Sequence, residues 1–434
     1  MKLENNGGII MDRLKISRTK DYFECNGRRV FYLADTVWSA FSNASPEEWE
    51  EYLEYRKTQG FNVLQINILK QWDASESDID IFPFGLDSRG NIDFYSFNEK
   101  YFKRAQEMLE KAAGKGFIPA LVVLWCDYVK DTWASSRVAT GHIMPMDAVK
   151  PYVEYIVGKF SRFNPIYIVS GDTNFESKDA VKYYEIALET LKLLDPGALT
   201  TLHLGGGLVD LPVEFVNSPH LDFYMYQSGH RFEEQHFPYK MAEDFCRLPV
   251  KRPVLNGEPC YEGHGHGNKY GRFNDFDIRK ATWQSLLSGA KAGITYGAHG
   301  IWGWHKKGKK FPSEQFSSKP YDWRTALRLK GAWDVAFARQ IFEKYNLFDI
   351  EPANLILNKT AEIRAAISQD KSKIAIYVPY SVDVEVNMDL SGYSFELINL
   401  AARYFVKPEI KTAAGVSTIK MHDFNTDVLL IGIK

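Results

Sequence analysis

The sequence predicts an α/β protein in which a (β/α)8 TIM barrel is followed by a small antiparallel β-sandwich. Three observations lead to this fold class. Eight short apolar runs recur up to residue 304, amphipathic helical patterns lie between most of them, and short alternating strands follow Pro352. Strands that alternate with helices in this way are typical of a barrel. We therefore place a barrel with an N-terminal extension at residues 1–350 and an all-β domain at residues 351–434.

The eight apolar runs are rich in β-branched and aromatic residues. Near-continuous runs of this kind are typical of parallel strands that are covered on both faces. In order they are RVFYLAD (29–35), FNVLQINIL (61–69), FIPALVVLW (117–125), NPIYIVSGD (164–172), LTTLHLGG (199–206), LDFYMYQSGH (221–230), RPVLNGE (252–258) and GITYGAHGIWGW (293–304).

The clearest helix lies between the first two runs, at residues 45–60. Ser45 and Glu48 form a capping-box pattern, and Pro46 suits the first helical position. Gly60 is a typical residue at which a helix ends. Similar amphipathic patterns cover residues 97–116, 147–160, 179–194, 277–293 and roughly 323–347. Helices after the fifth and sixth runs are poorly marked, so we expect those two units to be irregular.

A doubly wound sheet is the alternative to a barrel, and the sequence lacks its usual mark. The glycine-rich stretch LGGGL (204–208) does not have the G-x-G-x-x-G spacing of a dinucleotide site, and we interpret it as a turn. After Pro352 six short runs alternate between apolar and polar residues, as in a small sandwich. Because no low-complexity linker precedes them, we expect the two domains to pack tightly and the sandwich to brace the barrel.

The composition excludes several classes of protein. The chain has 434 residues, a formal net charge of −2, 45% hydrophobic residues and 25% charged residues, which is ordinary for a globular protein. A general nucleic-acid binder usually has a strong basic excess, so we expect no nucleic-acid partner. The sequence has no stretch of 18 or more consecutive apolar residues, so we also expect no membrane partner. The oligomeric state is left open.

The N-terminus and the cysteines bear on the compartment. The stretch MKLENNGGIIMDRLKIS lacks the apolar segment of a secretory signal, so the expected location is the cytoplasm, and Met11 is an alternative start to Met1. The four cysteines lie far apart and form no C-x-x-C pair, which predicts neither a disulfide framework nor a zinc site. The high aromatic content, with 10 Trp, 24 Tyr and 28 Phe, suits a sugar-binding cleft as well as a core.

Two carboxylates end strands of the predicted barrel. Asp172 ends the fourth run, within SGDTNF, and Glu258 ends the seventh, within NGEP. Barrel enzymes carry their chemistry at this end of the strands, so both side chains are predicted to face one cleft. A facing pair of carboxylates is what glycoside hydrolysis needs, with one group protonating the leaving oxygen. The alternative for each is a structural ion pair, and Glu176 is an alternative proton donor to Asp172.

Other polar and aromatic residues lie at the same strand ends. Aromatic faces can stack on sugar rings, and polar tips can bond their hydroxyl groups. The alternative for each Trp is packing in the core, and the alternative for Asp35 is that it fixes the first loop. The predicted substrate contacts are Asp35, Trp38, Trp125, Tyr226, His230, His299, Trp302 and Trp304.

Two further stretches are candidate functional sites. His264 and His266 form an H-x-H pair in a glycine-rich loop, and no other cluster with metal-ligand spacing lies near them. We therefore predict no metal and no cofactor, with a metal-dependent hydrolase as a remaining alternative. HKKGKK (305–310) is interpreted as a solvated loop that is also able to attract an acidic sugar such as a uronate.

Several of these stretches together resemble a known family. GRRVFYLADTVWSAF, EYLEYRKTQGFNVLQ, SGD, PVLNGEPCYEG and DWRTALRLKGAW resemble glycoside hydrolase family 140, the apiosidase-like barrel proteins, long labelled a domain of unknown function or an endoglucanase. The resemblance spans about residues 14 to 350. The stretch from YVPYSVDVEVNMDL to DVLLIGIK resembles the small sandwich that usually follows, which is named for collagen binding.

The resemblance implies a retaining hydrolase with Asp172 as acid/base and Glu258 as nucleophile. It also implies the release of apiose-linked fragments from pectin. Because the chain shows no export signal, the predicted substrate is a short, imported, plant-derived oligosaccharide, and the long loop at about 70–96 is where specificity is expected to differ. The alternative from another class is a non-catalytic carbohydrate-binding barrel protein.

Overall fold

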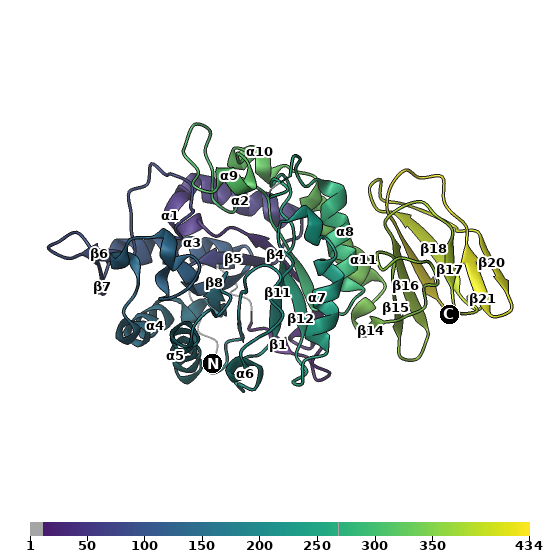
Figure 1. The fold of residues 1–434 in the computed structure, drawn as a ribbon, viewed down its shortest axis with the longest axis horizontal. Helices are drawn as coiled ribbons and strands as arrows, with labels where there is room; N and C mark the ends of the chain where they lie inside the picture. The colour runs from purple at the N-terminus through teal and green to yellow at the C-terminus, as the bar shows by residue number, and fades with distance from the viewer. Residues whose placement is uncertain (1–11, 268) are drawn as a thin grey trace.

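A computed structural model describes residues 12–267 and 269–434 (Figure 1), so the choice between Met1 and Met11 as the start lies outside the described residues. Eight parallel strands form a nearly closed barrel, which confirms the predicted fold class. They are β4 (Tyr32–Thr36), β5 (Val63–Asn67), β8 (Ile118–Trp125), β9 (Ile166–Gly171), β10 (Thr200–Thr201), β11 (Tyr224–Gln227), β12 (Val254–Glu258) and β13 (Gly293–Tyr296).

The strands pair in the order β10-β9-β8-β5-β4-β13-β12-β11, so neighbours in the chain are neighbours in the sheet. The ladder is open between β10 and β11. Hydrogen bonds cross the opening, among them one from Asp222 N–H to the Thr200 carbonyl at 3.0 Å and one from Thr201 Oγ1 to the Phe223 carbonyl at 2.8 Å. The carboxyl ends of all eight strands therefore meet at one end of the barrel.

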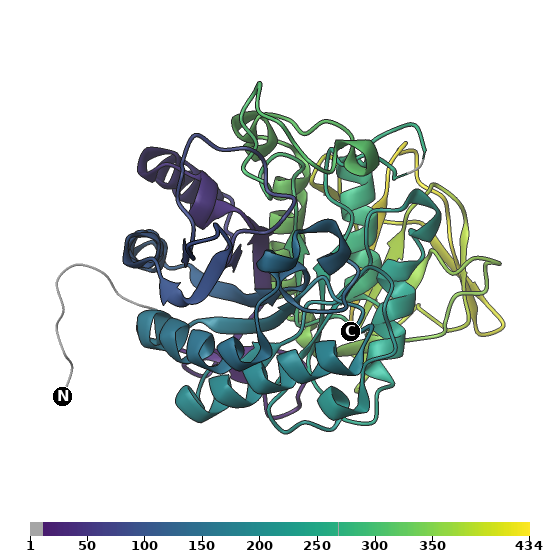
Figure 2. The ribbon, with the colours of Figure 1, turned by 60° about the vertical axis from the view of Figure 1, so that its left-hand side comes forward.

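Helices lie outside the parallel sheet (Figures 1 and 2). The longer ones are α2 (Pro46–Thr58), α3 (Glu99–Gly114), α4 (Met146–Phe160), α5 (Lys178–Leu194), α7 (Phe237–Cys246), α8 (Asp275–Leu286) and α11 (Gly331–Lys344). The short ones are α1 (Ala40–Asn43), α6 (Val213–Val216), α9 (Glu314–Ser317) and α10 (Trp323–Leu327).

The helix at the start of the barrel begins as its capping sequence predicts. The Ser45 hydroxyl accepts the Glu48 N–H at 3.2 Å, and the Glu48 carboxylate accepts the Ser45 N–H at 2.9 Å. The unit after the fifth strand is irregular, as expected, since α6 has four residues, but the unit after the sixth strand carries the ten-residue helix α7, so the expectation was wrong there. The pattern at 323–347 was predicted as one helix and is two, α10 and α11, because residues 328–330 leave the helical path between them.

Two small sheets were not predicted. The run at 29–35 is divided, so that β3 (Arg28–Val30) belongs to a separate antiparallel sheet with β1 (Lys15–Ile16) and β2 (Phe23–Cys25). The loop after β5 carries a hairpin of β6 (Phe84–Leu86) and β7 (Ile92–Phe97). The eighth run also ends early as a strand, at Tyr296, and residues 297–304 form a loop at the end of the barrel.

The C-terminal part consists of two antiparallel sheets around an apolar core of their own. The larger sheet has the order β14 (Ile350–Pro352), β15 (Arg364–Ser368), β16 (Lys373–Val378), β22 (Val428–Ile433), β18 (Ser394–Asn399) and β19 (Tyr404–Val406). The smaller one has the order β17 (Val384–Val386), β21 (Val416–Ile419) and β20 (Ile410–Ala413).

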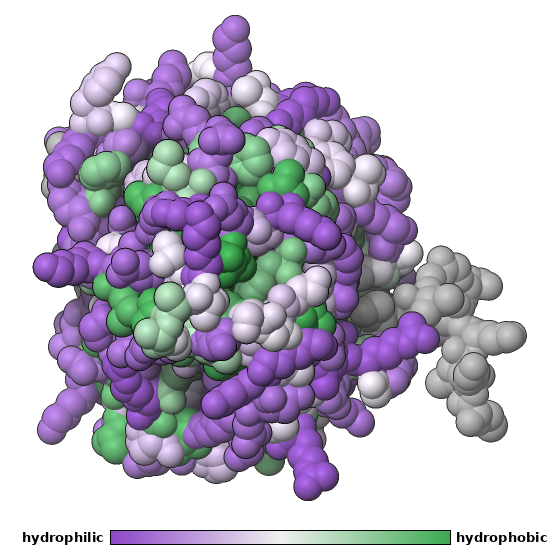
Figure 3. Space-filling view, turned by 90° about the vertical axis from the view of Figure 1, so that its right-hand side faces the viewer, coloured by the Kyte–Doolittle hydropathy of each residue, from purple (hydrophilic) through white to green (hydrophobic). Residues whose placement is uncertain are grey.

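These sheets lie against α8 and α11 on one side of the barrel (Figure 1). Apolar side chains of the larger sheet, such as Ile398 and Leu429, are part of the core that the barrel forms. The outer face of this end is mostly hydrophilic, with small groups of hydrophobic residues between the polar ones (Figure 3). Within the described residues, none of the helices is both long and apolar enough to cross a membrane.

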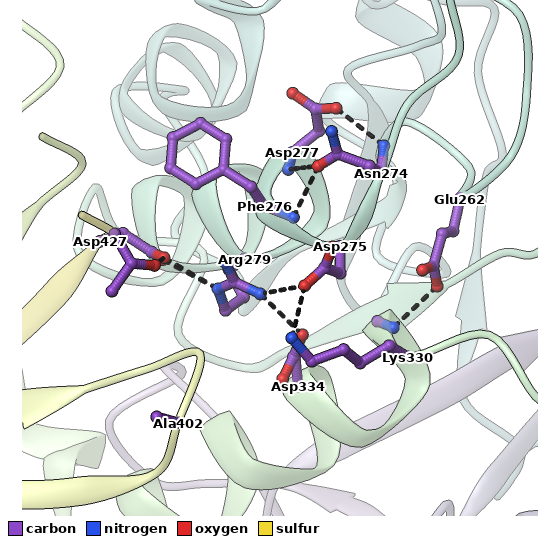
Figure 4. A network of polar contacts seen from close by, with 12 residues as sticks. Glu262, Asn274, Asp275, Phe276, Asp277, Arg279, Lys330, Asp334, Ala402 and Asp427 are labelled. Atoms are coloured by element: carbon purple, nitrogen blue, oxygen red, sulfur yellow. Dashed lines mark hydrogen bonds and ion pairs between the residues drawn. The ribbon is translucent and has the colours of Figure 1, made fainter. Parts of the chain in front are cut away.

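A buried ionic network joins the sheets to the barrel (Figure 4). Arg279 on α8 donates through Nε to Asp427 at 2.9 Å and through Nη1 to Asp275 at 2.8 Å and to Asp334 of α11 at 2.9 Å. Asp427 lies just before β22, and its side chain and that of Asp334 have no exposed surface. Arg403, from the C-terminal sheets, donates to the other oxygen of Asp334 at 3.0 Å.

We expect Arg279→Met to destabilise the protein by about 3–5 kcal/mol, because it leaves the charges of Asp334 and Asp427 buried without their main partner. Urea unfolding followed by tryptophan fluorescence measures the loss. The control is Arg247→Met, since the Arg247 side chain is 66% exposed and bonds only acidic neighbours on α7, where a surface pair contributes about 0–1 kcal/mol. Equal stability of the two variants would show that the network does not hold the parts together.

Candidate active site

A cavity of about 490 Å³ opens at the carboxyl end of the barrel strands. Every strand of the barrel contributes to its lining, either with its last residue or through the loop that follows. Asp172 and Glu258 both line it, as do four of the predicted substrate contacts, Trp38, Trp125, His230 and Trp302. The structure thus brings these six residues together, while their contact with a substrate stays a prediction.

Glu258 is the last residue of β12 and is 6% exposed. Its carboxylate is hydrogen-bonded by three side chains. Oε1 is 2.7 Å from Gln227 Nε2 and 2.8 Å from His230 Nε2, and Oε2 is 3.0 Å from His203 Nε2. A shift in the register of β11 and β12 between Tyr226 and Gln227 places Gln227 opposite Glu258.

Backbone contacts determine how both histidines bond Glu258. The Asp172 N–H donates to Nδ1 of His203 at 3.2 Å, and the Tyr261 N–H donates to Nδ1 of His230 at 3.3 Å. Because each Nδ1 accepts, the proton of a neutral imidazole lies on Nε2, which then donates to the carboxylate. Burial by itself raises the pKa of Glu258, but the hydrogen bonds from His203 and His230 outweigh it and hold that pKa well below its ordinary value. Glu258 is therefore ionised and fixed in orientation.

Asp172 follows β9 with a backbone φ of 49°, in the left-handed region that few residues other than glycine adopt. Its N–H bonds His203, and its carbonyl accepts Nε1–H of Trp133 at 2.7 Å, so the strained turn is held from both sides. Burial raises the pKa of Asp172 well above its ordinary value, and the negative charges of Glu258, Asp73 and Glu176 raise it further.

The surroundings of the two carboxylates therefore push their pKa values in opposite directions. Those of Glu258 favour the ionised form, and those of Asp172 favour the protonated form. Two groups whose environments push their pKa values apart are an acid paired with a nucleophile or base. The arrangement can thus deliver a proton from Asp172 to one atom while Glu258 attacks, or directs water to, the neighbouring atom.

Aromatic rings line the same cavity as the carboxylate pair. Trp38 and Trp125 lie against each other with ring centroids 5.4 Å apart, and both contact the His203 ring. Trp125 covers Gly171, where an added Cβ atom would come within 2.2 Å of the indole. Trp38 also donates to the Tyr261 hydroxyl at 3.3 Å. These flat apolar faces beside two carboxylates suit a ring with both C–H faces and hydroxyl groups.

The structure differs from the prediction for Asp35 and Tyr226, which face away from the cavity. Successive side chains of a strand point to opposite faces, and both residues point outward from the barrel. Asp35 is fully buried against α2, where it pairs with Arg56 at 2.6 Å and accepts the Tyr52 hydroxyl at 2.6 Å. The Tyr226 hydroxyl donates to the Pro238 carbonyl at 2.7 Å.

His299 and Trp304 also lie outside the cavity lining, although they follow the eighth strand as predicted. His299 is fully buried, its Nε2 lies 2.8 Å from the Ser318 carbonyl, and its Nδ1 accepts Nε1–H of Trp302 at 3.2 Å. It supports the cavity wall from behind through Trp302. Trp304 donates to Glu48 at 3.1 Å and stacks on Trp323, so it packs the outside of the barrel.

Several residues of the site were not predicted. His203 bonds Glu258 without lining the cavity, and it lies in the fifth run, where strand alternation places it on the same face as Thr201. Asp73, Trp72, Trp133 and Arg137 lie in loops after β5 and β8, and no local pattern marks them. The exposed Glu176 lies outside the lining and accepts the Trp133 N–H at 2.9 Å.

The two histidines of the H-x-H pair have different neighbours, and lysines of the HKKGKK loop form ion pairs. His264 lines the cavity with its ring stacked on His230, whereas His266 packs between Phe232 and Phe273. Within residues 12–267 and 269–434, no three His, Cys, Asp or Glu side chains are grouped so as to hold a metal ion. In the HKKGKK loop, Lys309 pairs with Asp78 and Lys306 pairs with Glu48, and the loop does not line the cavity.

Comparison with known proteins identifies a family and similar folds. The sequence profile described as "Apiosidase-like, catalytic domain" matches residues 17–349. A solved structure described as a glycoside hydrolase has a TM-score of 0.79 at 22% identity and covers 97% of each chain. A glycoside hydrolase family 5 structure from Bacteroides vulgatus has a TM-score of 0.80 at 18% identity, covering 97% of this chain and 93% of that one. At these identities the likeness concerns the fold, including the C-terminal sheets. No curated protein sequence matches this chain significantly.

Proposed function

This chain belongs to the apiosidase-like family of catalytic domains, and on that premise we propose that it is a retaining glycosidase that cleaves an O-glycosidic bond. The observation that carries the proposal is the pair in one cavity, an ionised Glu258 held by three hydrogen bonds and an Asp172 whose pKa is raised. Glycosidases of the two-carboxylate type need one protonated and one ionised carboxyl group.

In the first step of the proposed reaction, Glu258 attacks the anomeric carbon while Asp172 gives its proton to the leaving oxygen. The product is a glycosyl ester on Glu258 and a free alcohol. Ester formation removes the negative charge of Glu258, which is one cause of the raised pKa of Asp172. The pKa of Asp172 therefore falls at the moment when it must act as a base.

In the second step, Asp172 takes a proton from water, and the resulting hydroxide attacks the same carbon and releases Glu258. Asp172 is then protonated and Glu258 is ionised, as at the start. The hydrogen bonds from Gln227, His203 and His230 favour Glu258 as a leaving group, because they stabilise the carboxylate that forms.

The position of Arg137 favours a substrate that carries a carboxylate. Its guanidinium lies 5.2 Å from the ring centroids of both Trp72 and Trp133 and lines the cavity. No ion pair to Arg137 is formed within the described residues, so the group is free to bind a carboxylate from outside. We therefore propose a short pectic or apiose-containing oligosaccharide with a uronate unit, taken up into the cytoplasm, and glycoside hydrolase family 140 as the finer assignment.

The C-terminal sheets have a structural role in this proposal. The network around Arg279 joins them to α8 and α11, and α8 follows the loop that begins at Glu258. We propose that they brace the barrel and do not bind collagen.

Hydrolysis with retention is the first expected outcome. A panel of 4-nitrophenyl glycosides and pectic oligosaccharides is incubated with the protein, and the anomeric protons of the first product are followed by NMR. We expect the product to keep the configuration of the substrate, and Glu258→Gln to abolish turnover with the fold intact. An inverted product would contradict the nucleophile role of Glu258, and full activity of Glu258→Gln would end the assignment.

Asp172→Asn is expected to lower kcat/KM by about 10²- to 10⁴-fold, the range of general acid catalysis. The acid works in its protonated form, so the wild-type rate falls as the pH rises through the raised pKa of Asp172, and this basic limb should disappear in the variant. The matched control is Glu176→Gln, which removes an exposed carboxylate four residues away. If Glu176→Gln instead removes the basic limb, Glu176 is the proton donor.

Arg137→Met tests the acidic substrate. We expect it to lower kcat/KM for galacturonate-containing fragments by about 10- to 100-fold, since a hydrogen bond to a charged group contributes about 1.5–3 kcal/mol. Neutral aryl glycosides should be affected much less. Arg162→Met is the control, because Arg162 also stacks on an aromatic ring, that of Phe163, but lies outside the cavity lining. An equal loss on neutral and acidic substrates would argue against uronate binding.

A further inference from the structure

The loop after β5 brings a further carboxylate to the cavity, and the two-step reaction does not use it. Asp73 lines the cavity together with Asp172 and Glu258. It lies in the stretch QWD, at residues 71–73. Among the described residues Asp73 forms no ion pair, whereas the cavity's other acidic side chain, Glu234, pairs with Arg231 at 3.2 Å.

Asp73 is positioned from the interior of the barrel. Its Oδ1 accepts Nε2–H of Gln71 at 2.8 Å, and the side-chain Oε1 of Gln71 accepts Nδ2–H of Asn67, the buried last residue of β5. These two hydrogen bonds connect the carboxylate to a barrel strand, so its position does not depend on the loop alone. A side chain held in this way loses little conformational entropy on binding a ligand.

The loop itself is fixed against the loop after β13. The side-chain amide of Asn43 donates to the Ser75 carbonyl at 2.8 Å and to the Gly303 carbonyl at 3.2 Å, and so bridges the two loops. Ser313, from the second loop, donates to Oδ2 of Asp73 at 3.4 Å. That contact is longer than an ordinary O–H···O hydrogen bond, so Oδ2 keeps most of its capacity to accept.

The charges around Asp73 are mostly of its own sign. Burial, together with the charges of Asp127 and Glu258, raises the pKa of Asp73 to about 7, although the hydrogen bond from Gln71 acts to lower it. Asp172 lines the same cavity, and Arg137 does so from the loop after β8. A carboxylate placed among other carboxylates costs free energy, and such groups are typical of functional sites.

We propose that Asp73 binds hydroxyl groups of the sugar that lies between Asp172 and Glu258, and so determines which sugar the cavity accepts. This inference rests on the proposed function, because it assumes that the cavity holds a sugar. Hydroxyl groups donate to a carboxylate through short, charge-assisted hydrogen bonds. A site built to bond a particular hydroxyl rejects the analogue that lacks it, since the buried carboxylate is then left unpaired.

The test compares monodeoxy analogues on wild type and Asp73→Asn. The substrate is the 4-nitrophenyl glycoside that the wild type hydrolyses fastest, with its analogues lacking one hydroxyl group each. On the wild type we expect one or two analogues to lose about 10- to 100-fold in kcat/KM, as for a hydrogen bond to a charged group. On Asp73→Asn the same analogues should stay within about 2-fold of the parent glycoside, because the interacting partner is absent.

The control variant is Asp80→Asn. Asp80 is an exposed carboxylate of the same loop and lies outside the cavity lining, so its removal takes the same charge from the loop. It should keep the wild-type pattern across the analogues. Asn also keeps the shape of Asp73 and an oxygen that can accept from Gln71, so the loop is expected to keep its conformation.

Other outcomes overturn the inference. If Asp73→Asn slows every analogue by the same factor, Asp73 supports the loop and does not select the sugar. If the wild type hydrolyses no glycoside, the proposed function fails, and calorimetric binding of the panel of 4-nitrophenyl glycosides and pectic oligosaccharides to wild type and Asp73→Asn decides the role of Asp73. Equal binding by the two proteins, or no binding by either, would also overturn it.

Discussion

A buried, ionised carboxylate at Glu258 is the constraint on which the rest of the site depends. Removing such a charge from water costs several kcal/mol unless hydrogen bonds replace the water. Three side chains supply them, His203 after β10, Gln227 at the end of β11 and His230 just beyond it. The site therefore exists only when the ends of β10, β11 and β12 meet, and this makes barrel closure a condition for the chemistry.

One imidazole also links the two halves of the catalytic pair. His203 accepts the backbone N–H of Asp172 and lies within hydrogen-bond distance of Glu258. The relative position of the two carboxylates is thus determined by a rigid ring rather than by two independent loops. The same ring packs against Trp38 and Trp125, so the aromatic walls and the charged pair share one support.

The ion pairs that are buried outside the cavity hold the elements of the fold together. Arg56 pairs with Asp35 between α2 and the barrel, and Arg279 joins α8 and α11 to the C-terminal sheets. From sequence, Asp35 and Asp172 are alike, since each is a carboxylate at the end of an apolar run. Their surroundings separate them, because Asp35 points outward to a guanidinium, whereas Asp172 lies near other carboxylates.

The sequence by itself determined the barrel, the order of its strands, most helix positions and the placing of Asp172 and Glu258 at strand ends. These follow from local periodicity and capping, which neighbouring residues carry. Only the tertiary structure decided which carboxylate is held ionised, that Asp35 and Tyr226 face away from the cavity, that His203 bonds Glu258, and that Asp73 and Arg137 reach the cavity. A pKa depends on burial and on charges that are close in space, and a loop side chain is placed by contacts with other loops. Neither is recorded in a local pattern of residues.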